Sequence, residues 1–160
     1  MRWDAFAKAC PEVAAPARER FLADGLILVG TLRRDGSPRI SPNEPAFGGG
    51  RFFVSMMWRS RKALDVLRDP RVTVHSVPSD RENPAGDIKL YGRLLDEQDA
   101  EVREAFREGL RQRIGWAPDE PNYHCFSLEV EEASLIRLVV EPVALAWDPE
   151  QGLRELTLPT

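Results

Sequence analysis

Ser60, Arg61 and Lys62 are the residues of this sequence best suited to bind an anion. A short helix is expected to begin at Ser60, whose hydroxyl can cap it, and to end at Asp69-Pro70, because the residue before a proline avoids the helical region. Two cations in a first helical turn oppose the helix dipole. A phosphate there would gain from the free backbone N–H groups and from the forked arginine donor. The pattern therefore predicts a phosphate site, with a solvated basic turn as the alternative.

Histidine and cysteine give little sign of a second reactive centre. His75 and His124 are the only histidines and neither lies in a metal-binding motif. Cys10 and Cys125 are far apart and outside any Cys-x-x-Cys pattern. His124 and Cys125 are neighbours, but adjacent residues of a strand point to opposite faces, so they cannot act as base and nucleophile. We expect no metal site, no disulfide and no Cys–His catalytic pair.

Composition places the chain among acidic globular proteins. A chain of 160 residues is expected to form one domain, residues 1–160. The formal net charge of −4 and the pI of about 5.3 argue against a nucleic-acid surface. No apolar run approaches the ~20 residues of a membrane span, and the N-terminus lacks a signal-peptide core. We therefore expect a cytoplasmic protein that binds neither nucleic acid nor membranes.

Short strands joined by tight turns dominate the pattern. Asp35-Gly36 is the strongest hairpin signal. Pro38, Pro42 and Pro45 lie in or beside the returning strand and predict that it is an edge strand or bulged, because proline cannot donate to a sheet. The expected strands are 26–32 (apolar, hence buried on both faces), 39–47, 52–57, 72–77, 88–94, 125–130, 135–140 and 143–147.

Three helical segments accompany these strands. Residues 3–23 are expected to form an N-terminal helical segment interrupted near Pro11 and Pro16. The helix over 60–68 is expected to bury Ala63, Leu64 and Leu67, and the segment 97–114 has a clear apolar face, Val102, Phe106 and Leu110. Residues 78–86 and 116–123 are expected to be loops. This order favours an antiparallel barrel with helices outside it over a doubly wound parallel sheet, whose crossovers need longer connections.

With these motifs in their order, the chain resembles the pyridoxamine 5′-phosphate oxidase-like, FMN-binding split-barrel superfamily. The likeness rests on residues 31–39, 60–63, 69–72 and 88–93, within a stretch of about residues 20–95. The resemblance implies a mainly β fold with flanking helices (α+β), built on a six-stranded antiparallel split β-barrel. It also implies a homodimer with flavin sites at the interface between the two copies.

The resemblance also assigns residues to the phosphate of FMN. Ser60, Arg61 and Lys62 match the segment that grips this phosphate in the family. Arg39 holds the position, just after the first hairpin, from which an arginine reaches the same phosphate. Ser41 alternates with Arg39 on one strand face and is a candidate to hydrogen-bond the phosphate or a ribityl hydroxyl.

Five further residues are candidates to contact the flavin. Ser55, Met56, Met57 and Trp58 would run beside the isoalloxazine ring, for which Met and Trp offer apolar, polarizable surface. These residue types also occur commonly in cores. Lys89 would reach a cofactor across the dimer interface. The alternative interpretation is that Lys89 only belongs to an exposed cross-strand pair.

The chain departs from the oxidase itself at two places. Glu44 stands where the oxidase has a lysine. The oxidase's C-terminal tryptophan and arginine motif has no clear match after Val143. The resemblance is therefore to the superfamily and not to the true oxidase.

Three functions remain open on these grounds. The first is an FMN-binding oxidoreductase that acts on an unassigned small molecule. The second is a deazaflavin-dependent reductase, for whose acidic tail Arg33, Arg34 and Arg59 would supply a basic groove. The third is a non-enzymatic flavin or haem binder, in which His75 or His124 would have to serve as the haem ligand.

Overall fold

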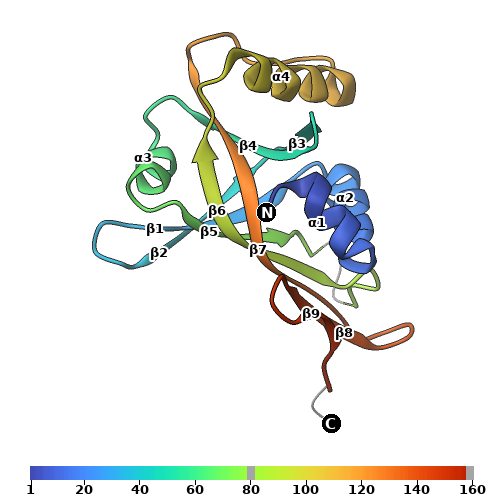
Figure 1. The fold of residues 1–160 in the computed structure, drawn as a ribbon. Helices are drawn as coiled ribbons and strands as arrows, with labels where there is room; N and C mark the ends of the chain where they lie inside the picture. The colour runs from blue at the N-terminus through green and yellow to red at the C-terminus, as the bar shows by residue number, and fades with distance from the viewer. Residues whose placement is uncertain (79–81, 158–160) are drawn as a thin grey trace.

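The computed structural model describes residues 1–78 and 82–157. Within them, nine antiparallel strands form one sheet and four helices lie around it (Figure 1). The helices are α1 (Trp3–Ala9), α2 (Pro11–Asp24), α3 (Arg61–Arg68) and α4 (Ala100–Ile114). The strands are β1 (Ile27–Leu32), β2 (Pro38–Asn43), β3 (Pro45–Gly48), β4 (Arg51–Met57), β5 (Arg71–Ser76), β6 (Asp87–Asp96), β7 (Tyr123–Arg137), β8 (Val143–Asp148) and β9 (Gly152–Glu155).

The sheet confirms the mainly β fold with flanking helices and the split-barrel type. Its strand order is β2-β1-β5-β6-β7-β4-β3, with the β8–β9 hairpin paired to β7. The two end strands, β2 and β3, follow each other in the chain and are separated only by Glu44. Counted as one bent strand, they leave six strands around the core, as expected. The predicted strand 39–47 is therefore broken at Glu44, and its prolines lie in the two edge strands.

The barrel opens along a seam between β2 and β4. Pro45 is still paired with Val54, but beyond this pair the strands diverge. The Asn43 side-chain amide bridges the gap by donating to the carbonyl of Ser55 at 2.8 Å. The seam is therefore bridged by a side-chain hydrogen bond instead of a ladder of backbone hydrogen bonds.

The core joins the inner faces of the strands to α1 and α2. Trp3 of α1 meets the ring of Phe47 at 4.9 Å between centroids, and Phe21 of α2 stacks on Phe52 at 5.6 Å. A second cluster holds α4 against β3 and β4. Phe106 and Leu110 are buried there, which confirms the predicted apolar face of this helix.

Two predicted burial patterns are wrong. On β1, Ile27 and Val29 are buried but Leu28 is partly exposed, since the outer face of this strand has solvent beside it instead of a second layer. On α3, Leu64 and Leu67 are 44% and 45% exposed, because the face that packs on the sheet carries other residues. Those inward residues are Ala63, Asp65 and Val66.

Two predicted boundaries are also wrong. Pro16 lies inside α2 instead of interrupting it, since the burial of neighbouring residues such as Ala17 and Phe21 outweighs the lost hydrogen bond. The strands predicted at 125–130 and 135–140 are one strand, β7, of 15 residues, which passes through a bulge opposite Tyr91 and Gly92. The predicted loop 78–86 includes residues 79–81, outside the described residues. No helix of the described part is long and apolar enough to cross a membrane.

Candidate functional site

The start of α3 has the local structure that the sequence predicts. The hydroxyl of Ser60 accepts a hydrogen bond from the backbone N–H of Ala63 at 3.4 Å, and Ser60 itself is extended. The helix ends at Asp69, whose N–H donates to the carbonyl of Asp65 at 2.8 Å. The first-turn residues Arg61 and Lys62 lie on two sides of this helix start, and each lines a different cavity.

Lys62 points into the seam. Its ammonium donates to the carbonyl of Pro42 and to the side-chain oxygen of Asn43, both at 3.0 Å. Burial lowers the pKa of Lys62 below its ordinary value. Asn43 thus joins β2, β4 and α3. Sequence reasoning missed Asn43, although its alternation with Arg39 and Ser41 on β2 was a usable signal.

A cavity of about 560 Å³, which we call the seam pocket, lies between β2, β4, α3 and the segment leading from α4 into β7. It brings together four of the predicted cofactor residues. Its lining includes Ser55, Met56, Met57 and Lys62, with Asn43 and Trp116. The pocket therefore combines polarizable apolar surface with a partly buried cation.

The segment that covers the seam pocket is held in place by an ion pair. Arg103 of α4 grips Glu120 with two donors, at 2.8 and 2.6 Å. Tyr123 donates its phenol proton to the same carboxylate at 2.7 Å. Trp116, which these bonds help to position across from β4, is 59% exposed.

A second cavity, the arginine hollow, lies on the other side of the α3 start and has a volume of about 670 Å³. Five arginines line it, together with Leu64 and two carboxylates. Figure 1 shows the tip of the β1–β2 hairpin extending beside α3, and the two elements supply these side chains. The arginines are Arg33, Arg34, Arg39, Arg61 and Arg68, and the carboxylates are Asp35 and Asp65.

Arg39 reaches this hollow while held by a buried carboxylate. Its Nε donates to Asp65 Oδ2 at 2.6 Å. Burial raises the pKa of Asp65, but the bonds from Arg39, Arg68 and Thr31 outweigh that effect and hold it below its ordinary value. Ser41 follows Arg39 on the same half-buried face of β2. Within the described residues, Arg61 has no ion-pair partner.

Four predicted residues line neither cavity, namely Ser41, Trp58, Ser60 and Lys89. Trp58 is 57% exposed and stacks on His124 at the edge of the site. Lys89 lies on the outer face of the sheet, opposite His75 of β5 and Ser134 of β7. Within one copy of the chain, Lys89 therefore does not join the other candidates.

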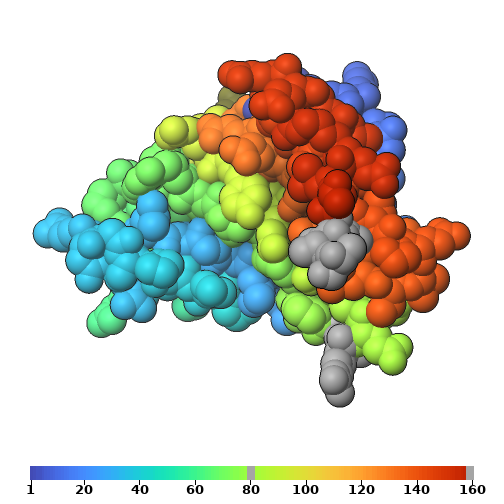
Figure 2. All heavy atoms as spheres, turned by 90° about the horizontal axis from the view of Figure 1, so that it is seen from below, coloured from blue at the N-terminus to red at the C-terminus, as the bar shows by residue number. Residues whose placement is uncertain are grey.

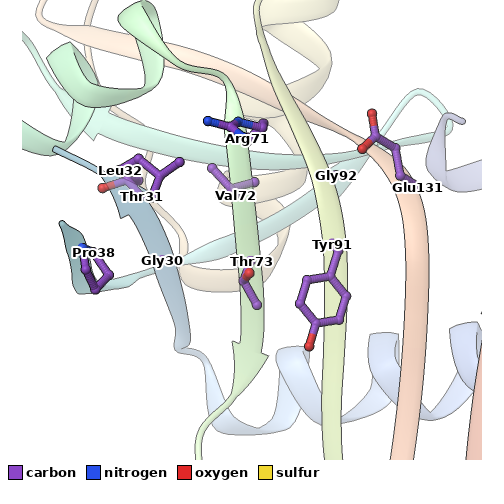
Figure 3. Close-up of a pocket in the computed structure, with 10 residues that line it drawn as sticks. All are labelled: Gly30, Thr31, Leu32, Pro38, Arg71, Val72, Thr73, Tyr91, Gly92 and Glu131. Atoms are coloured by element: carbon purple, nitrogen blue, oxygen red, sulfur yellow. The ribbon is translucent and has the colours of Figure 1, made fainter. Parts of the chain in front are cut away.

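The outer face of β2, β1, β5 and β6 has a hollow of its own, of about 350 Å³ (Figure 3). Ile40, Gly30, Thr73 and Tyr91 stand opposite one another across the four strands. Ile40 is 72% exposed. Seen from below, the β1–β2 hairpin lies on one side of the molecule and the β8–β9 hairpin on the other, with part of β6 between them (Figure 2).

The histidines differ in what their ring nitrogens contact. His124 is buried, and its Nε2 accepts a hydrogen bond from the backbone N–H of Arg59 at 3.1 Å. His75 is bonded through Nδ1 to the carbonyl of Ser76 at 2.5 Å. Its ring lines an apolar outer-face hollow of about 250 Å³ with Leu28 and Ile40.

Glu44 lies at the rim of the seam pocket. Its carboxylate faces Arg113 of α4, with Oε2 and Nη2 3.9 Å apart. Arg113 thus provides a positive charge beside Glu44 at the rim of the pocket, a pairing that the sequence did not predict.

The comparisons with known proteins fit this architecture. The model of the pyridoxamine 5′-phosphate oxidase family matches residues 15–137. The chain belongs to this family. No curated protein matches the chain.

Solved structures with the same fold include several pyridoxamine 5′-phosphate oxidase relatives. A pyridoxamine 5′-phosphate oxidase-related, FMN-binding protein from Nostoc punctiforme has 13% identity over 97% of each chain and a TM-score of 0.65. A NimC/NimA family protein from Clostridium acetobutylicum has 15% identity over 89% of this chain and 97% of that one, with a TM-score of 0.69. A haem-binding protein from Mycobacterium smegmatis has 16% identity over 89% and 57%, with a TM-score of 0.58. At these identities the similarity establishes the fold.

Proposed function

We propose that this protein is an FMN-dependent oxidoreductase that acts on a small molecule. One observation carries the proposal: the seam pocket and the arginine hollow flank the start of α3, where Lys62 faces the first and its neighbour Arg61 the second. FMN has two parts that match these cavities. Its ring system suits the seam pocket, and its phosphate, at the end of a flexible chain, suits the arginine hollow.

The residues present fit the two ends of FMN. Met56, Met57 and Trp116 offer a ring system apolar and polarizable contacts. Arg39 and Arg61 offer a phosphate charged donors, and the capped start of α3 adds its dipole. Ser60 itself serves as the helix cap.

FMN, when bound, supplies the redox chemistry, and the protein binds it, orients it and excludes water. Lys62, fixed by Pro42 and Asn43, would place a positive charge at the seam. The segment tied down by Arg103 and Glu120 would limit the space left for a substrate. This division of labour requires no acid or base among the residues of either cavity.

We further propose that two copies associate through the outer face of the sheet. Ile40 is largely exposed there, and exposed apolar side chains gathered on one face are typical of an interface. Lys89 and Tyr91 share this face, so a second copy is the route by which Lys89 would approach a cofactor. The dimer would also cover the hollow between β1, β5 and β6.

Flavin titration and turnover test the proposal. The purified protein is titrated with FMN, riboflavin and the deazaflavin cofactor, and the FMN-loaded protein is assayed for oxidation of reduced nicotinamide nucleotides. We expect FMN to bind more tightly than riboflavin and the loaded protein to turn over. Preference for the deazaflavin would favour the reductase alternative. Tight FMN binding without turnover of any donor tried would favour a carrier.

Haem binding is a second candidate because of the contacts of His75. Histidines that ligate metals generally donate their other ring N–H to a carbonyl or carboxylate, as Nδ1 of His75 can to Ser76. The apolar hollow beside His75 suits a porphyrin edge. His124 is the control, because its Nε2 is already bonded to Arg59. The haem spectra of His75→Ala and His124→Ala test this candidate function. Loss of the haem spectrum only in His75→Ala would support haem binding through His75, and an intact spectrum in both variants would exclude it.

A further inference from the structure

The inner face of α3 carries a carboxylate where it packs against the sheet. Asp65 is only 5% exposed, while Leu64 beside it faces the hollow. A buried charge is costly unless it is paired and hydrogen-bonded. Asp65 has such partners: Arg39 at 2.6 Å, Thr31 at 3.3 Å and Arg68 at 3.4 Å. These bonds link α3 to β1 and β2.

The two arginines on Asp65 are bound in different ways. Arg68 uses its terminal nitrogens, which donate to Asp65 and to the carbonyl of Leu32. Arg39 uses only its Nε. Across residues 1–78 and 82–157, neither terminal nitrogen of Arg39 has a protein partner. Arg68 therefore serves the fold, whereas the forked end of Arg39 is left for a ligand.

That forked end borders the arginine hollow. The Arg39 side chain is 22% exposed and lines the cavity beside Arg61. Two parallel N–H donors of a guanidinium match two oxygens of a phosphate, and the match depends on the orientation of the plane. An arginine held at Nε loses less side-chain freedom on binding than a free one.

We propose that Asp65 is a positioning residue for the cofactor phosphate, holding Arg39 by Nε so that its two terminal nitrogens face the phosphate oxygens. The proposal rests on the proposed function and names a residue that would act through Arg39, although Asp65 also lines the hollow. It extends the site from the arginines of the hollow to a carboxylate of the same hollow that is buried where α3 packs on the sheet.

The direction in which FMN affinity changes when the Asp65 carboxylate is removed distinguishes a positioning role from an effect of total charge. If only total charge mattered, removal of the Asp65 carboxylate would strengthen the binding of an anion in the hollow. If orientation matters, the same removal weakens it, because Arg39 loses its anchor. Riboflavin has no phosphate, so its affinity should respond to neither effect.

The experiment compares FMN and riboflavin affinities of the wild type, Asp65→Asn and Asp65→Ala. We expect Asp65→Ala to weaken FMN about tenfold or more, in line with the loss of a charged hydrogen bond, and riboflavin to change less than about twofold. Asp65→Asn should lose less, since its amide oxygen can still accept from Nε. Asp69→Asn is the matched control, because Asp69 pairs with Arg71 outside the hollow.

A double-mutant cycle distinguishes the loss of Arg39 positioning from a general folding defect, because a folding defect would lower FMN affinity in either background. In an Arg39→Ala background, Asp65→Asn should cause no further loss of FMN affinity, because the two residues act as one unit. Unchanged or tighter FMN binding by Asp65→Ala, or equal losses for both flavins, would overturn the inference while leaving the proposed function intact. A wild type that binds neither flavin would overturn the proposed function and the inference with it.

Discussion

The indole ring of Trp58 lies flat on the imidazole of His124, with centroids 4.4 Å apart and planes inclined by 11°. His124 also accepts the backbone N–H of Arg59, which adopts a left-handed φ of 53°. A non-glycine residue in that region needs support from its surroundings. The stack and the hydrogen bond supply it, and they fix the chain just before the cap at Ser60.

This contact predicts a pH dependence. Burial lowers the pKa of His124 below its ordinary value of 6.5, with Asp96 and Arg103 acting in opposite directions. The unfolded chain therefore binds a proton more readily than the folded one as the pH falls below 6.5. Protonation would also turn the acceptor of the Arg59 bond into a donor. Stability and FMN affinity should fall together in this range.

His124→Phe provides the comparison, since it keeps an aromatic ring under Trp58 but cannot titrate. Thermal unfolding and FMN affinity are followed from about pH 7.5 to about pH 5.5, the range in which histidine titrates. We expect the variant to lose the part of the pH dependence that belongs to His124. An identical slope in the two proteins would mean that His124 is not its source.

The proposed dimer interface predicts different effects for substitutions at two apolar residues of similar exposure. Ile40, on the outer face of β2, is 72% exposed, and Leu138, after β7, is 67% exposed. A buried, unpaired carboxylate at an interface is costly. Ile40→Asp should therefore convert a dimer to a monomer in light scattering, whereas Leu138→Asp should not. A protein that is monomeric before mutation, or equal behaviour of the two variants, would contradict the assigned face.

Gly92 is predicted to tolerate no side chain. It lies at the bulge between β6 and β7, and a Cβ there would approach the carbonyl oxygen of Glu129 to 1.9 Å. Gly92→Ala should lower the free energy of unfolding by about 1–3 kcal/mol, the usual cost of overpacking. Denaturant unfolding measures it, and an unchanged midpoint would mean that the strands can separate without penalty.

Local signals in the sequence were enough for the elements nearest the site. The serine cap, the Asp69-Pro70 stop and the Asp35-Gly36 turn each act within a few residues, and the structure has α3 and the β1–β2 hairpin where they predict them. The apolar stripe of α4 is likewise a local pattern. The family resemblance supplied the barrel that joins these elements.

Non-local relationships account for what the sequence did not predict. The inward position of Asp65, in place of Leu64, depends on partners 26 and 34 residues away, Arg39 and Thr31. From the sequence, Trp116 is a candidate either to line the substrate side or to close the barrel, and its place at the seam pocket depends on the packing of α4 on β3 and β4. Patterns of apolar residues place hydrophobic side chains inside by default and cannot identify a carboxylate buried by pairing.

The central claim, a phosphate held at the start of α3, is tested most directly by the double variant Arg61→Ala/Lys62→Ala titrated with FMN. Loss of charged contacts should weaken FMN by at least about tenfold. Riboflavin should lose less affinity than FMN, because it has no phosphate to lose and only Lys62 of the two residues lines the seam pocket. Lys8→Ala/Arg111→Ala removes the same charge outside both cavities and should behave as wild type. Unchanged FMN affinity in the Arg61→Ala/Lys62→Ala protein would contradict the account.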